Sequence, residues 1–159
     1  MSRFDYDDDG DHVITWEMIQ WNLKRHIASP KGQAKLREFR DALLAIPGRR
    51  LIDGALVNEG DVCAIGAFAA YKRVQQGLDW PAAVEAIRDL YQPKTHWGWL
   101  EDSDAYTTQD AGVRECGLTR TLAWQLAWQN DETLDRLTPE QRWQAMYDWT
   151  CKQIREVAA

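Results

Sequence analysis

Apolar residues recur every three or four positions along most of this chain, and strict alternation of apolar and polar residues is scarce. That periodicity is typical of helices that pack one face against a core. The stripes begin at Trp16 and continue to Val157. We therefore expect a mainly α-helical fold, a compact single-domain bundle of six to seven helices over residues 15–159, preceded by an acidic segment over residues 1–14.

Start and stop signals divide these stripes into separate helices. Ser29-Pro30 is the usual cap and first-turn proline of a helix, and Pro47-Gly48 is the signal that ends it. Thr138-Pro139-Glu140-Gln141 has the pattern of a capping box. Further helices are expected to begin at Thr15, Asp61, Asp79, Thr108 and Thr119. Near residues 50–58, around Asp53-Gly54, the pattern predicts either a short β-hairpin or an extended connection.

Two of the expected helices have unusual faces. The helix over residues 62–76 is apolar on nearly all sides and built from small residues, so we expect other helices to cross it closely. The helix from Thr119 to Asn130 has leucines on one side and Trp124 and Trp128 nearly opposite, which predicts a central or interfacial position. Residues 109–126 also imitate a helix-turn-helix. Their second helix has few basic or amide side chains, however, so we prefer ordinary helix packing.

The chain contains nine tryptophans, more than a core of this size requires. Each indole has a large apolar surface and an N–H that needs an acceptor, so the set either fills an oversized core or lines a surface that another molecule covers. Trp97 and Trp99, separated by Gly98, lie in an irregular acidic stretch over residues 92–106. Our leading hypothesis is a protein-binding loop that contains His96, Trp97 and Trp99.

The net charge of −6 is distributed unevenly. Residues 24–50 contain eight basic residues and two acidic ones. An acidic chain with a single basic segment argues against a general nucleic-acid binder. Local contacts with phosphate or nucleic acid remain an alternative, and the candidate residues for them are Lys31, Lys35, Arg37 and Arg40.

The acidic N-terminus resembles the first half of an EF-hand calcium loop, because Asp5, Asp7 and Asp9 alternate ahead of Gly10. The second half is out of register: counted from Asp5, the bidentate acid should fall at position 16, and Glu17 is one residue late. The candidates for a weak calcium site are therefore Asp5, Asp7 and Asp9, and the alternative is a solvated acidic end. We expect no other cofactor.

Signals for catalysis are few. Cys63, Cys116 and Cys151 are far apart and odd in number, so we expect reduced thiols rather than disulfides or a zinc site. Cys63 falls in the first turn of its expected helix, where a helix dipole lowers a thiol pKa, so we weigh a nucleophile against a small packing residue. A pocket near His96, in a small-ligand binder or a hydrolase, is the enzyme alternative. We favour a binding protein over an enzyme.

The longest nearly apolar run, residues 62–71, is about half of what a membrane span needs. The N-terminus has no apolar segment of the kind found in signal peptides. We therefore expect a cytoplasmic protein without a membrane partner. The pattern leaves the oligomeric state open.

Several short runs resemble a set of small proteins encoded in tailed-phage and prophage genomes. The runs extend from Lys31-Gly32-Gln33-Ala34 to Arg49-Arg50-Leu51-Ile52, over Gly60-Asp61-Val62-Cys63-Ala64-Ile65-Gly66-Ala67, from Gly117-Leu118-Thr119 to Leu122-Ala123-Trp124, and over Asn130-Asp131-Glu132 and Thr138-Pro139-Glu140-Gln141-Arg142-Trp143. Together they cover most of the chain. The resemblance implies a phage-encoded accessory protein in the cytoplasm of an infected or lysogenic bacterial host, and it assigns no role to a particular residue. Together with the tryptophans, it favours a protein that binds a host or phage macromolecule.

Replacing Trp97 or Trp99 by alanine separates a binding role from a packing role. If the two rings anchor a partner, each change weakens binding by on the order of 2 kcal/mol and leaves the melting temperature nearly unchanged. If they complete the core, each change lowers the unfolding free energy by about 3 to 5 kcal/mol. We expect the first result, and thermal melts that show a large loss of stability in both variants would exclude the binding loop.

Overall fold

The computed structural model describes residues 16–91, 103–134 and 136–155. These residues form seven helices and a two-stranded antiparallel hairpin, which confirms the mainly helical expectation. The helices are α1 (Trp16–Ala28), α2 (Pro30–Ala45), α3 (Ala64–Gln75), α4 (Trp80–Tyr91), α5 (Ser103–Cys116), α6 (Arg120–Asp131) and α7 (Pro139–Gln153), and the strands are β1 (Val57–Asn58) and β2 (Asp61–Val62).

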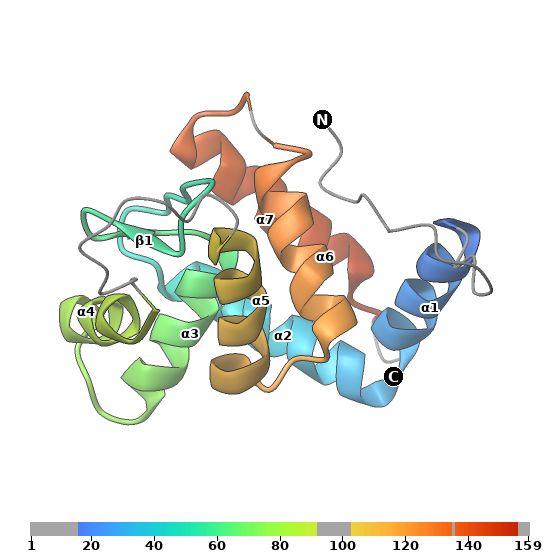
Figure 1. Ribbon diagram of the computed structural model, residues 1–159, viewed down its shortest axis with the longest axis horizontal. Coiled ribbons are helices and arrows are strands. Elements are labelled where there is room, and N and C mark those ends of the chain that lie inside the picture. Colours follow the sequence, from blue (N-terminus) through green and yellow to red (C-terminus); the bar gives the residue numbers. More distant parts are fainter. Residues whose placement is uncertain (1–15, 92–102, 135, 156–159) are drawn as a thin grey trace.

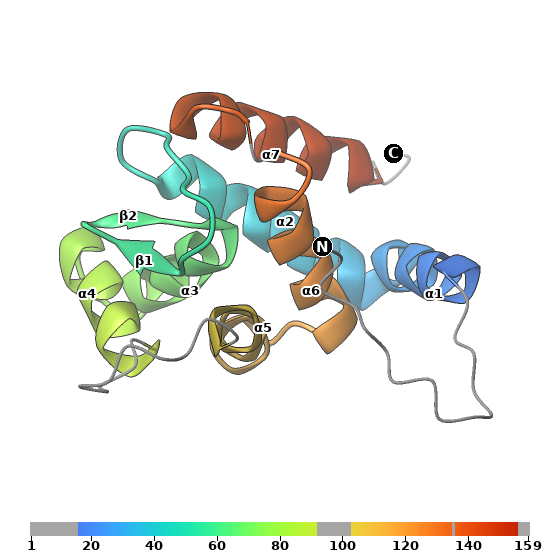
Figure 2. The same cartoon turned by 45° about the horizontal axis from the view of Figure 1, so that its top comes forward.

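Helix α3 is the centre of the packing, because it contacts α2, α4, α5 and α6. Helices α1 and α4 lie at opposite ends of the long axis of the molecule (Figure 1). The turned view shows the hairpin beside α3 and α4, with α7 lying along α2 (Figure 2). Helix α1 has its main contacts with α2 and α6, so one of its sides is left outside the bundle.

The first seven residues of α3 are all buried, and most of them are small, as the sequence predicts. The small members are Ala64, Gly66, Ala67, Ala69 and Ala70. A Cβ atom added at Gly66 would lie 2.2 Å from the Leu56 carbonyl oxygen, so this glycine permits a close approach of two backbones. A Cβ atom at Gly112 of α5 would lie 2.9 Å from the Ala123 Cβ of α6. The helices around α3 are therefore close together.

Most of the expected helix starts are confirmed. Ser29 caps α2 through its side chain, which accepts from the Gly32 N–H, and Thr119 caps α6 in the same way. The capping box formed by Thr138 and Gln141 is present at the start of α7. Helix α5 begins at Ser103, earlier than expected.

The start of α3 differs from the prediction. Its cap is Cys63, whose Sγ accepts from the Gly66 N–H at 3.4 Å. Asp61, the expected cap, belongs to β2 and pairs with Asn58. The helix starts at Ala64, two residues later than predicted, because Cys63 supplies the extended cap conformation that typically precedes a helix.

The hairpin also has its turn elsewhere than at Asp53-Gly54. Its turn residues are Glu59 and Gly60, both with positive φ. The Ile52 N–H donates instead to the Val62 carbonyl oxygen at 3.0 Å. Because the Ile52 N–H is bonded to Val62 of β2, residues 51–54 do not form a separate hairpin. They form an extended connection.

The substitution Gly66→Ala tests how closely α3 packs against the Leu56 backbone. Helix propensity and overpacking change the unfolding free energy in opposite directions at this position. Helix propensity alone predicts that alanine stabilises the protein by about 1 kcal/mol. The contact with the Leu56 backbone predicts a loss of about 1 to 3 kcal/mol through overpacking. We expect the loss in chemical denaturation, and a gain in stability would show that α3 is not closely packed at this position.

Candidate partner-binding surface

The fold buries few of its tryptophans. Of the six whose side chains the structure describes, only Trp143 is buried, at 4% exposure. Trp80, Trp124, Trp128 and Trp149 are half-buried, and Trp21 is 58% exposed. Within the described part of the chain, the indoles therefore do not fill the centre of the core, and the surface hypothesis fits their positions better.

The buried and half-buried indoles have packing roles. The Trp143 indole N–H donates to the Leu43 carbonyl oxygen at 2.8 Å, and its ring stacks on Tyr147. Trp124 and Trp128 stack on each other along α6, with ring centroids 5.9 Å apart and an interplanar angle of 14°. These side chains are stabilised by contacts inside the molecule.

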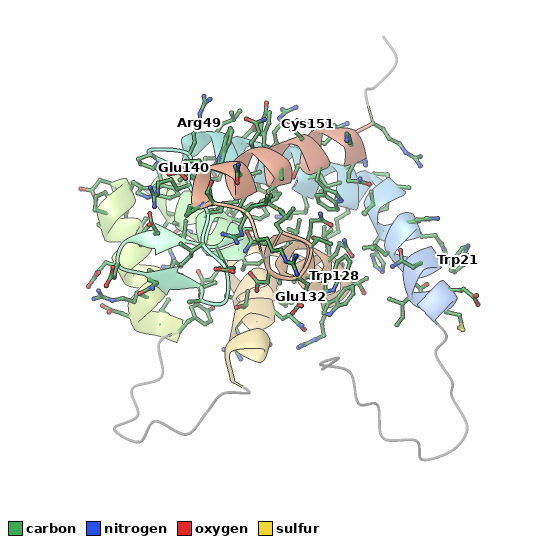
Figure 3. All side chains as sticks on the ribbon, turned by 90° about the horizontal axis from the view of Figure 1, so that it is seen from above. Trp21, Arg49, Trp128, Glu132, Glu140 and Cys151 are labelled. Carbon is green, nitrogen blue, oxygen red and sulfur yellow. The ribbon has the colours of Figure 1, made fainter. Side chains whose placement is uncertain are left out.

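Trp21 differs from them because it projects from the outer side of α1 (Figure 3). The Arg25 guanidinium lies 4.6 Å from the centre of the indole ring, in a cation–π contact. Lys24 is exposed beside it. Residues three and four positions apart share one side of a helix. We call Trp21, Lys24 and Arg25 together the Trp21 face.

Helix α1 is held at its C-terminal end, which fixes the position of the Trp21 face. A Cβ atom at Gly32 would lie 1.9 Å from the His26 carbonyl oxygen, so α2 starts very close to the end of α1. The buried Gln33 side chain donates to the carbonyl oxygens of Ile27 and Gln153, at 2.8 and 2.9 Å. Leu23 is the buried residue of α1. The face therefore stands on an anchored helix.

A signal for this face is present in the sequence. Trp21 lies outside the stripe formed by Ile19, Leu23 and Ile27, so its position alone predicts exposure. The paired tryptophans of residues 92–106 are a stronger local signal. His96, Trp97 and Trp99 lie outside the described residues, as do Asp5, Asp7 and Asp9. The binding loop and the calcium site therefore stay predictions.

The four residues expected to contact phosphate do not converge on one site. Lys31 is exposed at the start of α2. Lys35 Nζ donates to the Cys116 carbonyl oxygen at 2.8 Å and to Glu38. Arg37 donates to the Arg155 carbonyl oxygen, and Arg40 pairs with the adjacent Asp41 at 3.4 Å. Three of the four side chains are thus bound to the chain itself.

Lys31 and Lys35 do line a small pocket where α2 and α6 begin, together with His26. Helix N-termini favour anions, which makes the place chemically suitable for one. Its volume is about 30 Å³, which is room for a few water molecules.

The described thiols do not support nucleophilic catalysis. Cys63 is buried, and burial raises its pKa to about 12, so desolvation outweighs the helix dipole. Burial also raises the pKa of Cys116. All three cysteines are free, as expected, and Cys151 is exposed on α7. The nucleophile hypothesis for Cys63 is wrong: the residue packs in the core and caps α3.

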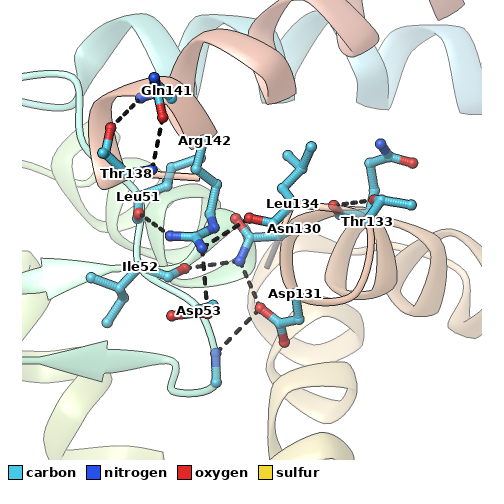
Figure 4. Close-up of polar contacts among 12 residues, drawn as sticks. Leu51, Ile52, Asp53, Asn130, Asp131, Thr133, Leu134, Thr138, Gln141 and Arg142 are labelled. Carbon is cyan, nitrogen blue, oxygen red and sulfur yellow. Dashed lines mark hydrogen bonds and ion pairs between the residues drawn. The ribbon is translucent and has the colours of Figure 1, made fainter. Parts of the chain in front are cut away.

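A buried polar cluster joins α6 and α7 to the connection after α2 (Figure 4). Arg142 is 3% exposed, and its guanidinium donates to the carbonyl oxygens of Leu51 and Leu134, at 3.2 and 3.0 Å. The same group pairs with Asp53 at 3.3 Å. Asn130 Nδ2 donates to the Ile52 carbonyl oxygen at 2.9 Å. The cluster satisfies backbone groups that the extended connection would otherwise leave buried.

Other ionisable groups are also used in structural contacts. Burial opposes the ionisation of Glu38, but hydrogen bonds from Lys72 and Lys35 outweigh it and lower the pKa. Burial and the nearby Glu115 carboxylate raise the pKa of Tyr91 to about 12. In residues 16–91, 103–134 and 136–155, no group of His, Cys, Asp and Glu side chains is placed to hold a metal ion.

Comparisons with known proteins leave the surface as the main guide to function. The chain matches no protein-family model, no curated protein and no solved structure. None of the helices in the described ranges is long and apolar enough to cross a membrane. The phage context stays an expectation from the sequence.

A thiol-specific reagent such as Ellman's reagent tests the burial of the cysteines. In the folded protein at mildly alkaline pH we expect only Cys151 to react, and all three thiols to react after unfolding. Cys151→Ser should abolish the fast reaction. Because folding raises the pKa of Cys63, stability is retained below the ordinary thiol value and falls as the pH rises above it. Rapid modification of Cys63 in the folded Cys151→Ser variant would contradict the structure.

Proposed function

We propose that the protein is a phage-encoded accessory protein that acts in the cytoplasm of its bacterial host by binding another protein, of the host or of the phage. The observation that carries this proposal is the exposure of Trp21 on an anchored helix at one end of the molecule. The phage context comes from the sequence resemblance alone.

An exposed indole is informative because it contributes little to the fold and much to an interface. Trp21 has 58% of its surface in water, so truncating it removes little packing. Tryptophan is enriched among the residues that dominate binding energy, because one ring buries a large area at a small cost in side-chain entropy. The same helix also exposes Met18, which adds apolar surface one turn away.

The anchoring of α1 favours binding for a second reason. Gln33 and Leu23 hold the helix without using the Trp21 face. A partner would therefore meet a side chain on a preformed helix rather than one on a segment that must first be ordered. Preformed surfaces bind more tightly because less conformational entropy is lost on association.

An affinity capture experiment tests the proposal. Wild-type protein, Trp21→Ala and Leu90→Ala are immobilised and exposed to an extract of infected bacterial cells, and the retained proteins are identified by mass spectrometry. Leu90 is the matched control, because it is 59% exposed and lies on α4 at the opposite end of the molecule. We expect a partner that wild type and Leu90→Ala retain and that Trp21→Ala binds about thirtyfold more weakly.

Thermal melts of the same three proteins complete the design. Trp21→Ala should melt close to wild type, because substitutions at exposed positions usually change the unfolding free energy by about 0.5 kcal/mol or less. Equal retention by wild type and Trp21→Ala would contradict the proposal. A large loss of stability in Trp21→Ala would show that the ring serves the fold instead.

A further inference from the structure

The charges beside Trp21 distinguish one kind of partner from others. Lys24 and Arg25 are both exposed, and neither forms an ion pair within the described residues. Lys31, exposed at the start of α2, has no such pair there either. Within the described residues some basic side chains pair with carboxylates, as Arg50 does with Glu140 and Arg73 with Glu115, whereas others do not. Lys24 and Arg25 differ from the other unpaired cations because they lie beside an exposed indole, which Arg25 contacts on one face.

From this charge complementarity we infer that the Trp21 face binds an acidic peptide segment of the partner protein, one that places an apolar or aromatic side chain on Trp21 and carboxylates on Lys24 and Arg25. The inference rests on the proposed function and names the chemistry of its partner. The apolar side chain covers the indole, while the carboxylates neutralise two cations that no described residue neutralises.

The arrangement along α1 gives the peptide a direction. Lys24 and Arg25 lie on the C-terminal side of Trp21, whereas Glu17 is exposed one turn on its N-terminal side. Carboxylates of the partner are attracted to Lys24 and Arg25 and repelled by Glu17. The acidic residues of the peptide therefore lie toward the end of α1 that joins α2.

A peptide fits these observations better than a nucleic acid. Nucleic-acid affinity comes mainly from many phosphate contacts over an extended basic surface. Here the basic side chains are few, so the face lacks the extended basic surface that a long polyanion needs. A short acidic segment needs only the local cations and one apolar anchor, both of which the Trp21 face supplies.

The probe is a short fluorescein-labelled peptide in which glutamates flank a central leucine–phenylalanine pair, followed by fluorescence anisotropy with the full chain. Three comparison probes are the same peptide with glutamine for glutamate, the same peptide with alanine for the central pair, and a single-stranded oligonucleotide. We expect the acidic peptide to bind most tightly, and its affinity to fall as salt is added.

Matched variants locate the binding. Trp21→Ala should weaken binding by about tenfold or more, and Trp21→Phe should restore part of it. Lys24→Glu should weaken it roughly fivefold, because the reversed charge repels the peptide. Arg136→Glu makes the same change in net charge at an exposed residue of the turn between α6 and α7, and it should leave the affinity nearly unchanged.

Several results would overturn the inference. Equal binding of the glutamine peptide would remove the role of charge, and tighter binding of the oligonucleotide to the same residues would assign the face to nucleic acid. Concentration-dependent self-association lost in Trp21→Ala would assign it to a second copy of the chain. Peptide binding seen only after the N-terminal aspartates are replaced by asparagine would assign it to the chain's own acidic segment.

The two proposals fail in different ways. If no acidic peptide binds but a captured protein still depends on Trp21, the chemistry of the partner is wrong and the binding function stands. If a protein is captured and Trp21→Ala retains it equally, the partner binds elsewhere on the chain and the Trp21 face is not its site. If wild type retains no protein above background, the binding function itself is wrong.

Discussion

The close approach of backbones around α3 is the constraint on which the rest of the structure depends. Gly66 admits the Leu56 carbonyl oxygen where a methyl group would clash, and Gly112 brings α5 against Ala123 of α6. Between these close contacts the core is filled by phenylalanine and aliphatic side chains, among them Phe39, Phe68 and Ile65, which are fully buried. Of the six tryptophans whose side chains are described, only Trp143 joins them, under Arg49, while the others are half-buried, except Trp21, which reaches the solvent.

Close packing alone does not hold the connection between α2 and the hairpin. This stretch passes between α6 and α7 without a regular ladder, so its carbonyl groups need donors from side chains. Arg142 and Asn130 supply them at Leu51 and Ile52. Truncating a buried arginine that serves several acceptors leaves those groups unsatisfied, which is expensive in a dry interior. The polar cluster is thus a structural element, and burial raises the pKa of Asp131 at its edge.

Local signals in the sequence predicted the helices well, because caps and stripes act over a few residues. Ser29, Thr119 and the Thr138–Gln141 box start helices where expected. The contacts that could not be predicted join residues far apart in the sequence. Arg142 donates a hydrogen bond to Leu51, 91 positions away, and no periodic pattern indicates that contact. Cys63 caps α3 in place of the expected Asp61, and cap preferences could not predict this because Asp is a preferred cap residue and Cys is not. Trp21 was predictable as an exposed residue from its place off the stripe, but the sequence alone offered several surfaces of tryptophan and no means to rank them.

The fold makes little use of Trp21, whose side chain is 58% exposed, and the proposed function places a partner on it. Fluorine NMR of protein labelled with 5-fluorotryptophan measures this directly, with the Trp21 resonance assigned from the Trp21→Phe variant. Replacing H₂O by D₂O shifts a fluorine resonance in proportion to the contact of its ring with solvent. The account predicts a large solvent isotope shift for Trp21 and, among the six tryptophans whose side chains are described, the smallest for the buried Trp143. A Trp21 resonance as insensitive to solvent as that of Trp143 would contradict it.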